Sequence, residues 1–142
     1  MRSKIFLGGA AMIMITGGAF SGKKAYAKER FGFSDEEILN GENCSPEAVF
    51  SAKCIADYQL IVKHLLEEND DVQTFTERLC KENPNAVVII NEIGAGIIPL
   101  EKNDRIWREE TGRSGCFIAR NSDEVIRLAC GIPTTIKGEG KA

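Results

Sequence analysis

One segment decides how this chain folds: Met12-Ile13-Met14-Ile15-Thr16-Gly17-Gly18-Ala19-Phe20-Ser21-Gly22-Lys23-Lys24. Residues 12–16 form an apolar run that is typical of a buried strand, and residues 23–31 are helix-prone up to Gly32. The glycine-rich stretch between them has the spacing G-x-x-x-x-G-K, which is the pattern of a phosphate-binding loop. The segment therefore predicts a strand, a tight loop and a helix in direct succession.

The chemistry of such a loop explains its residue types. Glycines let backbone N–H groups turn toward phosphate oxygens, the next helix presents the positive end of its dipole, and the lysine reaches the terminal phosphates. Position 24 departs from the pattern, because Lys24 stands where a Ser or Thr hydroxyl normally binds magnesium. The predicted nucleotide-binding residues are Gly17, Gly18, Ala19, Phe20, Ser21, Gly22, Lys23 and Lys24.

Length and composition are those of an ordinary globular protein. The 142 residues predict one domain, and 43% of them are hydrophobic while 27% are charged. A net charge of −3 without a basic cluster argues against nucleic acid as a partner. We expect an N-terminal extension over residues 1–11, one nucleotide-binding domain over 12–137 and a flexible tail over 138–142. Three residues stay open as the functional start: Met1, Met12 and Met14.

The N-terminus also has features of a secretory signal. Arg2 and Lys4 precede an apolar stretch, and Ala25-Tyr26-Ala27 resembles a cleavage site. However, Lys23 and Lys24 separate the apolar run from that site, and a signal peptide has no reason to contain a phosphate-loop pattern. We therefore expect a cytoplasmic protein without a membrane partner, and secretion is the alternative. The five cysteines, an odd number without a C-x-x-C pair, fit reduced thiols.

Downstream patterns alternate between helical and extended. Ser45-Pro46-Glu47 is a helix-start signal, and the apolar spacing after it predicts one helix to about Glu68. Residues 86–90 read as a strand buried on both faces of a parallel sheet. The other predicted elements are a brief strand at 38–39, a helix from Val72 that Asn83-Pro84-Asn85 ends, a helix containing Arg105 that is interrupted or ends near Gly112, a helical stretch over 114–121 and a last strand over 125–130. This alternation predicts an α/β, P-loop NTPase-like three-layer fold with a mainly parallel sheet.

Glu92 is the second candidate for catalysis, beside Lys23. It follows the most apolar predicted strand, and ligands of open α/β sheets bind at the carboxyl ends of the strands. A carboxylate there can hold magnesium or accept a proton, whereas the plainer interpretation is a loop or helix-cap acid. Gly94 and Gly96 would let the backbone approach a ligand, or merely turn.

Two blocks of sequence resemble the bifunctional adenosylcobinamide kinase and adenosylcobinamide-phosphate guanylyltransferase family of cobalamin biosynthesis. The first block, Ile13 to Lys23, is similar to the opening strand and GGxxSGK loop of that family. The second is longer and more specific, and its order and spacing follow the family pattern. Its residues are Asn91-Glu92-Ile93-Gly94-Ala95-Gly96-Ile97-Ile98-Pro99, Arg105, Gly112-Arg113, Asp123-Glu124-Val125, Gly131-Ile132-Pro133 and Ile136-Lys137.

The resemblance implies phosphoryl transfer from GTP or ATP to the aminopropanol hydroxyl of a cobinamide-type corrinoid, with magnesium, in a homo-oligomer. Lys23 would offset charge on the transferred group, and Glu92 would position magnesium or the acceptor hydroxyl. The family transfers guanylate through a histidine in a basic H-R-x-x-R-P segment. That segment is not found here, and His64 has no flanking match, so we expect no guanylyl-histidine. The alternative function is a catalytically silent GTP- or ATP-binding protein.

Overall fold

The computed structural model describes residues 12–93 and 102–138, and within these a six-stranded sheet forms the centre of the molecule. The strand order is β2-β3-β4-β1-β5-β6, with the first five strands parallel and β6 antiparallel to β5. The strands are β1 (Ile13–Gly17), β2 (Ile38–Asn40), β3 (Cys54–Ala56), β4 (Val87–Asn91), β5 (Glu124–Ala129) and β6 (Ile132–Lys137).

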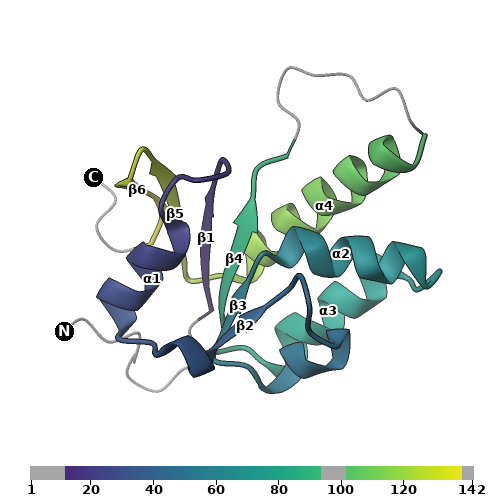
Figure 1. Cartoon of the computed structure of the whole chain (residues 1–142), viewed down its shortest axis with the longest axis horizontal. Helices are drawn as coiled ribbons and strands as arrows, with labels where there is room; N and C mark the ends of the chain where they lie inside the picture. Colours follow the sequence, from purple (N-terminus) through teal and green to yellow (C-terminus); the bar gives the residue numbers. More distant parts are fainter. Residues whose placement is uncertain (1–11, 94–101, 139–142) are drawn as a thin grey trace.

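Helices cover both faces of this sheet, as Figure 1 shows. Ile13 and Ile15 of β1 pack with Ala27 and Phe31 on the face that α1 covers. Met14 points to the opposite face and joins the core that α2, α3 and α4 close. The helices are α1 (Lys23–Phe31), α2 (Tyr58–Glu67), α3 (Val72–Glu82) and α4 (Lys102–Asn121), with two short 3-10 helices, η1 (Asp35–Glu37) and η2 (Pro46–Ser51). The predicted three-layer α/β arrangement with a mainly parallel sheet is confirmed.

Strand β1 places the phosphate-loop segment at the middle of one sheet edge. It pairs with β4 on one side and with β5 on the other, so that Gly17 lies opposite Asn91 and Leu128. The carboxyl ends of the parallel strands therefore meet around Gly17. In open α/β sheets this edge carries the ligand site.

The predicted single helix from Ser45 to Glu68 is wrong. Ser45-Pro46 does begin a helix, but η2 ends at Ser51 and the buried strand β3 follows, before α2 begins at Tyr58. A three-residue strand is too short to show a periodicity of its own, so its apolar residues fit the helical spacing of the residues around them. Pairing with β2 and β4 decides its conformation, and Asp57, at a positive φ of 58°, separates strand from helix.

Two predictions near the C-terminus also need correction. Helix α4 continues through Gly112 to Asn121, because glycine costs a helix only about 1 kcal/mol and packing against α2 and α3 outweighs that cost. The chain also continues past the expected last strand. Cys130 and Gly131, both at positive φ, form a two-residue turn of the hairpin type, and β6 returns along β5 with Pro133 on an edge strand.

None of the described helices combines the length and the apolar composition that a membrane crossing requires.

Candidate nucleotide-binding site

The segment after β1 has the predicted strand, loop and helix geometry. Gly17 ends the strand at a φ of 150°, and a Cβ there would lie 2.5 Å from the Leu128 carbonyl oxygen, so only glycine fits. Gly22, at a φ of 91°, precedes the first residue of α1. The Ser21 carbonyl accepts a hydrogen bond from the Gly131 N–H at 3.0 Å, and the Gly17 carbonyl accepts one from the Glu92 N–H at 2.8 Å. The turn after β5 and the end of β4 therefore fix the loop.

Lys23 points back over this loop. Its side chain is 6% exposed, and its Nζ donates to the Gly18 carbonyl at 2.6 Å and to Ser21 Oγ at 3.3 Å. Burial lowers the pKa of Lys23, while the negative charges of Asp57 and Glu92 act in the opposite direction. The amine thus donates to two neutral oxygens, and two carboxylates are near enough to act on its charge. Phosphate oxygens, which carry charge, are better acceptors than the loop carbonyl that Lys23 now contacts.

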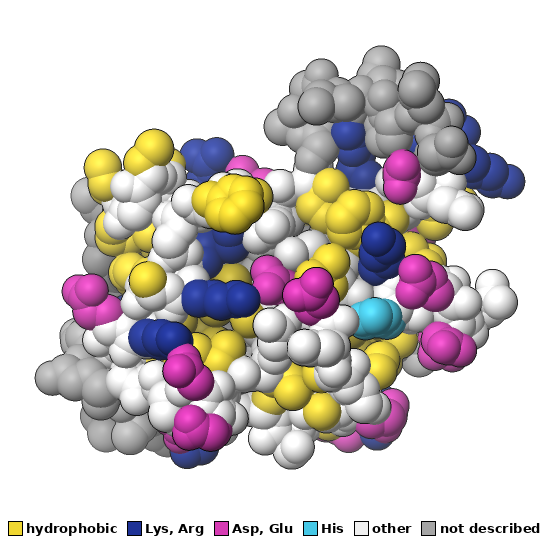
Figure 2. Space-filling view, viewed as in Figure 1, with side chains coloured by type: hydrophobic (Ala, Val, Ile, Leu, Met, Phe, Trp, Pro, Cys, Tyr) yellow, Lys and Arg dark blue, Asp and Glu magenta, His cyan; other side chains and the backbone are white. Residues whose placement is uncertain are grey.

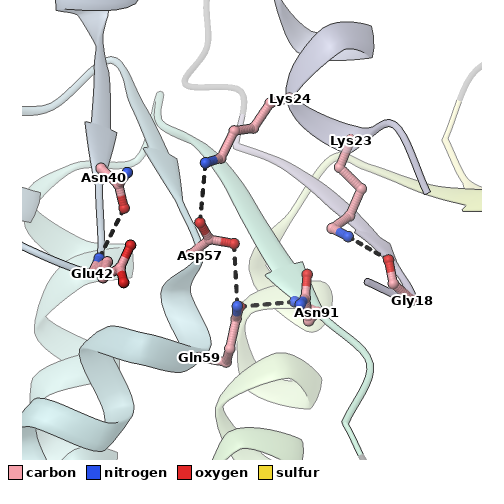
Figure 3. A network of polar contacts seen from close by, with 8 residues as sticks. All are labelled: Gly18, Lys23, Lys24, Asn40, Glu42, Asp57, Gln59 and Asn91. Atoms are coloured by element: carbon pink, nitrogen blue, oxygen red, sulfur yellow. Dashed lines mark hydrogen bonds and ion pairs between the residues drawn. The ribbon is translucent and has the colours of Figure 1, made fainter. Parts of the chain in front are cut away.

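Asp57 joins the site from the end of β3, as Figure 3 shows. Its Oδ2 lies 3.2 Å from Lys24 Nζ, and its Oδ1 accepts a hydrogen bond from Gln59 Nε2 at 3.2 Å. Gln59 in turn accepts a 2.9 Å hydrogen bond from the backbone N–H of Asn91 through its own Oε1. This network ties the ends of β3 and β4 to the first turn of α1.

Glu92 follows β4 but bonds toward β5. Its two carboxylate oxygens accept hydrogen bonds from Arg127, at 2.7 Å from Nε and 3.1 Å from Nη2. These bonds, with a smaller effect of Lys23, lower the pKa of Glu92. The carboxylate is therefore ionised at neutral pH. It is 38% exposed, so it remains accessible from solvent.

The donor set is compatible with magnesium that a nucleotide brings. Within the described residues no three His, Cys, Asp or Glu side chains converge on one point as a metal site. Magnesium at nucleotide sites needs only one or two carboxylates, since phosphates and water complete its shell. Asp57 and Glu92 both act on the charge of Lys23, so both lie in its neighbourhood. Either carboxylate could supply an oxygen, although each is paired with a cation here.

A cavity of about 360 Å³ lies over the loop, within the size range of small-molecule sites. Figure 2 shows basic and acidic side chains alternating on this face between α1 and α2, without a large patch of one sign. Phe20 lies at the rim with its side chain fully exposed. The cavity is lined by Ala19, Phe20, Ser21, Gly22, Lys23, Lys24, Ala25, Asp57, Ile89 and Asn91.

Three other residues that the sequence analysis names, Glu92, His64 and Lys137, do not line this cavity. Glu92 lines a second cavity beside α4, and residues 94–99 lie outside the described residues. His64 Nε2 bonds to the Glu42 carbonyl at 3.0 Å, and its Nδ1 lies 3.7 Å from Glu67. Within the second sequence block, Lys137 Nζ donates to the carbonyls that end α4.

The sequence interpretation missed three residues of the site. The helical pattern over residues 45–68 hides the break at β3, so it does not show that Asp57 follows a strand and that Gln59 lies in the first turn of a new helix. Arg127 carried a usable signal, because it interrupts the apolar run of the last predicted strand. Its partner Glu92 lies 35 positions away, and only the pairing of β5 with β1 brings the two together.

The central parallel sheet, the glycine-rich loop after β1 and the helix that follows define a P-loop NTPase-like α/β protein. The family model of cobinamide kinase / cobinamide phosphate guanyltransferase matches residues 48–136, more than half of the chain. The chain belongs to this family, whose members are transferases of cobinamide metabolism. The matched range contains Asp57, Glu92 and Arg127, and the glycine-rich loop precedes it. A comparison with curated proteins finds no significant match.

Proposed function

We propose that this chain is a nucleotide-dependent kinase that phosphorylates the aminopropanol hydroxyl of cobinamide in cobalamin biosynthesis, with GTP or ATP as donor. The observation that carries the proposal is Lys23, a buried amine at the first turn of α1 whose Nζ lies over the loop and donates to the Gly18 carbonyl. A buried ammonium that donates only to neutral oxygens, at a helix N-terminus, supports binding of polyphosphate.

The loop residues would do most of the chemical work. Backbone N–H groups of the loop would bind the phosphates, and Lys23 would exchange its bond to the Gly18 carbonyl for bonds to the terminal phosphate oxygens. There its charge would stabilise the negative charge that develops on the transferred group. Magnesium, when bound with the nucleotide, would neutralise part of the phosphate charge, with an oxygen from Asp57 or Glu92 as its protein ligand.

The transfer step balances without a further reactant. The acceptor hydroxyl oxygen forms a bond to the terminal phosphorus, and the bond from that phosphorus to the bridging oxygen breaks. The nucleoside diphosphate leaves with the electron pair. The hydroxyl proton passes to Glu92 or to water, and Glu92 is available for this because Arg127 keeps it ionised.

A second candidate function is a catalytically silent nucleotide-binding protein. One observation favours it: Lys24 replaces the hydroxyl that normally binds magnesium, and its ammonium lies 3.2 Å from Asp57 Oδ2. A cation held at this carboxylate competes with a metal for the same oxygen atoms. Turnover distinguishes the two functions, because a silent protein would bind GTP or ATP without releasing diphosphate in the presence of cobinamide.

The test removes the amine that carries the proposal. Lys23→Ala should weaken GTP and ATP binding roughly ten- to a hundredfold, as expected for lost hydrogen bonds to charged groups, and should abolish phosphoryl transfer. Titration calorimetry with both nucleotides, and phosphorylation of cobinamide, measure the two effects. Lys28→Ala is the matched control, because Lys28 is an exposed lysine of the same helix and pairs with Asp35. Equal nucleotide affinities of wild type and Lys23→Ala would refute the phosphate-loop assignment.

A further inference from the structure

A second cavity lies between the sheet and α4, on the face away from α1. Its volume is about 340 Å³, which is the size of a site for a small ligand. Met14, Ile90 and Val125 of the sheet form one wall, and α4 forms the other. In Figure 1, α4 runs from the upper right toward β4 and closes this side of the sheet.

One buried hydroxyl in this cavity lacks a partner. Thr111 on α4 lines the cavity and is 3% exposed, yet its Oγ1 forms no hydrogen bond with residues 12–93 or 102–138. Buried polar groups are almost always paired, because an unpaired one keeps the full cost of losing water. An unsatisfied hydroxyl on a cavity wall is therefore a specific indication that a ligand bonds there.

Two glycines of α4, close to Thr111 in the chain, also line the cavity. Gly112 and Gly115 lie inside α4 without positive φ, so helix geometry does not require them. A Cβ at Gly112 would meet nothing within 4 Å, and one at Gly115 would lie 3.8 Å from Ile90 Cδ1, an ordinary contact. Alanine would favour the helix at both positions. The glycines instead keep the wall and mouth of the cavity open.

The lining has one polar end. Thr16, Asn91 and Glu92 lie at the carboxyl ends of β1 and β4, whereas the rest of the sheet wall is aliphatic. Asn91 also lines the cavity over the phosphate loop, so the two cavities adjoin at the end of β4. Glu92 already has Arg127 as its counter-ion, and Arg108 of α4 also lines the cavity. An aliphatic chain with a hydroxyl and an amide suits this lining, because a guanidinium can donate hydrogen bonds to hydroxyl and amide oxygens.

We infer that this cavity binds the acceptor arm of the substrate, a short aliphatic amide-linked alcohol, and that Thr111 is one of its hydrogen-bond partners. This inference rests on the proposed kinase function, because it places the acceptor hydroxyl at the polar end, toward the phosphate loop. The volume fits a side arm and excludes a corrin ring, which stays outside the cavity. Thr111 binds the amide of the arm, and the aliphatic wall contacts its methyl and methylene groups.

The chain offers a direct measure of occupancy. Cys116 lines this cavity and is exposed. Cys130, in the turn between β5 and β6, is also exposed but lines neither this cavity nor the one over the phosphate loop. Cobinamide, or N-acetyl-1-amino-2-propanol as a mimic of the arm, should slow alkylation of Cys116 by iodoacetamide at least threefold at saturation. Alkylation of Cys130 should not change. Peptide mass spectrometry on the full chain follows both thiols in the same sample.

Three variants test the wall itself. Thr111→Val should weaken cobinamide binding about tenfold, the loss expected for one hydrogen bond, without lowering the melting temperature, since it also removes an unpaired hydroxyl. Thr111→Ser should restore binding. Gly112→Leu should block the mouth and abolish cobinamide binding, although it replaces a glycine in a helix by a better helix former. All three should bind GTP like the wild type, and Thr134→Val, on the exposed strand β6, is the neutral control.

Every outcome decides between the two proposals. Protection of Cys116 without turnover would support the acceptor cavity and refute the kinase. Turnover without protection of Cys116, with Thr111→Val and Gly112→Leu both binding cobinamide like the wild type, would overturn the cavity and leave the kinase in place. If neither probe protects Cys116 and neither binds, the acceptor cavity is refuted, whatever the nucleotide does.

Discussion

At the scale of single residues, the site differs from an ordinary phosphate loop by one substitution with a clear consequence. Lys24 neither turns wholly to solvent nor points to the loop, but pairs with Asp57 and is 46% exposed. An ammonium can only donate hydrogen bonds, so it cannot replace the hydroxyl that normally binds magnesium. It can, however, hold the Asp57 carboxylate away from a metal.

The first prediction concerns this competition. Lys24→Ser should increase the gain in GTP affinity that magnesium gives, because it frees Asp57 and restores a hydroxyl. Glu92→Gln should reduce that gain if Glu92 is the ligand, and Asp57→Asn should reduce it if Asp57 is. Asparagine tolerates the positive φ of 58° at this position, so the second change removes charge with little strain.

Calorimetric titration of GTP, with magnesium and with EDTA, measures these gains for wild type and the three variants. A wild type that binds GTP equally well under both conditions, together with an unchanged Glu92→Gln, would remove the metal role of Glu92. The silent nucleotide-binding function would then gain support.

The second prediction uses the acid titration of Glu92. Arg127 holds the pKa of Glu92 below its ordinary value, so the folded state binds this proton less readily than the unfolded state. The pair therefore stabilises the fold above the ordinary glutamate pKa, and that contribution is lost as the pH falls through the lower folded-state value. Because both side chains are more than a third exposed, the contribution is small.

Urea unfolding at pH 7 and at steps from about pH 5 to about pH 3 compares wild type with Arg127→Met. The difference in the free energy of unfolding should shrink toward acid pH. Glu92→Gln serves as the control, since its stability should lack this part of the pH dependence. A difference between wild type and Arg127→Met that stays constant with pH would contradict the assignment.

At the scale of elements, a buried ion pair connects α1 to β5, the strand next to β1. Arg30 on α1 donates to both carboxylate oxygens of Glu124 on β5, at 2.9 and 2.7 Å, and the two side chains are only 14% and 9% exposed. Since α1 begins at the phosphate loop, this pair sets the direction of the helix that points at the site. Glu124 belongs to the second sequence block, and its contact indicates a structural role.

Removal of one partner should therefore cost stability. Glu124→Leu leaves a buried guanidinium without its counter-ion and should lower the free energy of unfolding by roughly 3 kcal/mol. The double variant Arg30→Met with Glu124→Leu should cost clearly less than the sum of its single variants, because it removes both charges together. Urea unfolding of all four proteins completes this cycle. Additive single effects would show that the pair is not coupled.

At the scale of the whole molecule, the chain has the parallel sheet and the loop after β1, but its one histidine contacts another part of the chain. His64 lies on α2 and is held by the Glu42 carbonyl, not by the phosphate loop. A ring nitrogen that bonds to a carbonyl must carry a proton there, so this atom is not a free nucleophile.

We therefore predict that the protein forms no covalent guanylyl-histidine. Incubation with GTP labelled in the α-phosphate and with magnesium, followed by denaturation, should leave no acid-labile label on the chain. Label that appears in wild type and disappears in His64→Ala would contradict this prediction and identify His64 as the acceptor. Label that survives in His64→Ala would exclude histidine as the attachment site, because the sequence contains one histidine.

The sequence by itself determined the features that depend on local chemistry. Gly17, Gly22 and Lys23 at their spacing specify a loop and a helix start, because few residue types fit positive φ or close backbone approach. The apolar β-branched run of β4 specifies a strand buried on both faces. These local preferences were sufficient for the α/β class and for the position of the loop between β1 and α1.

Only the tertiary structure decided what depends on pairing across the sheet. β3 is too short to carry its own signal, so its neighbours β2 and β4 make it a strand and thereby bring Asp57 to Lys24. Glu92 meets Arg127 only because β4 and β5 flank β1. Such contacts join residues far apart in the chain, and no local propensity encodes them, because their free energy is gained only after the whole sheet has assembled.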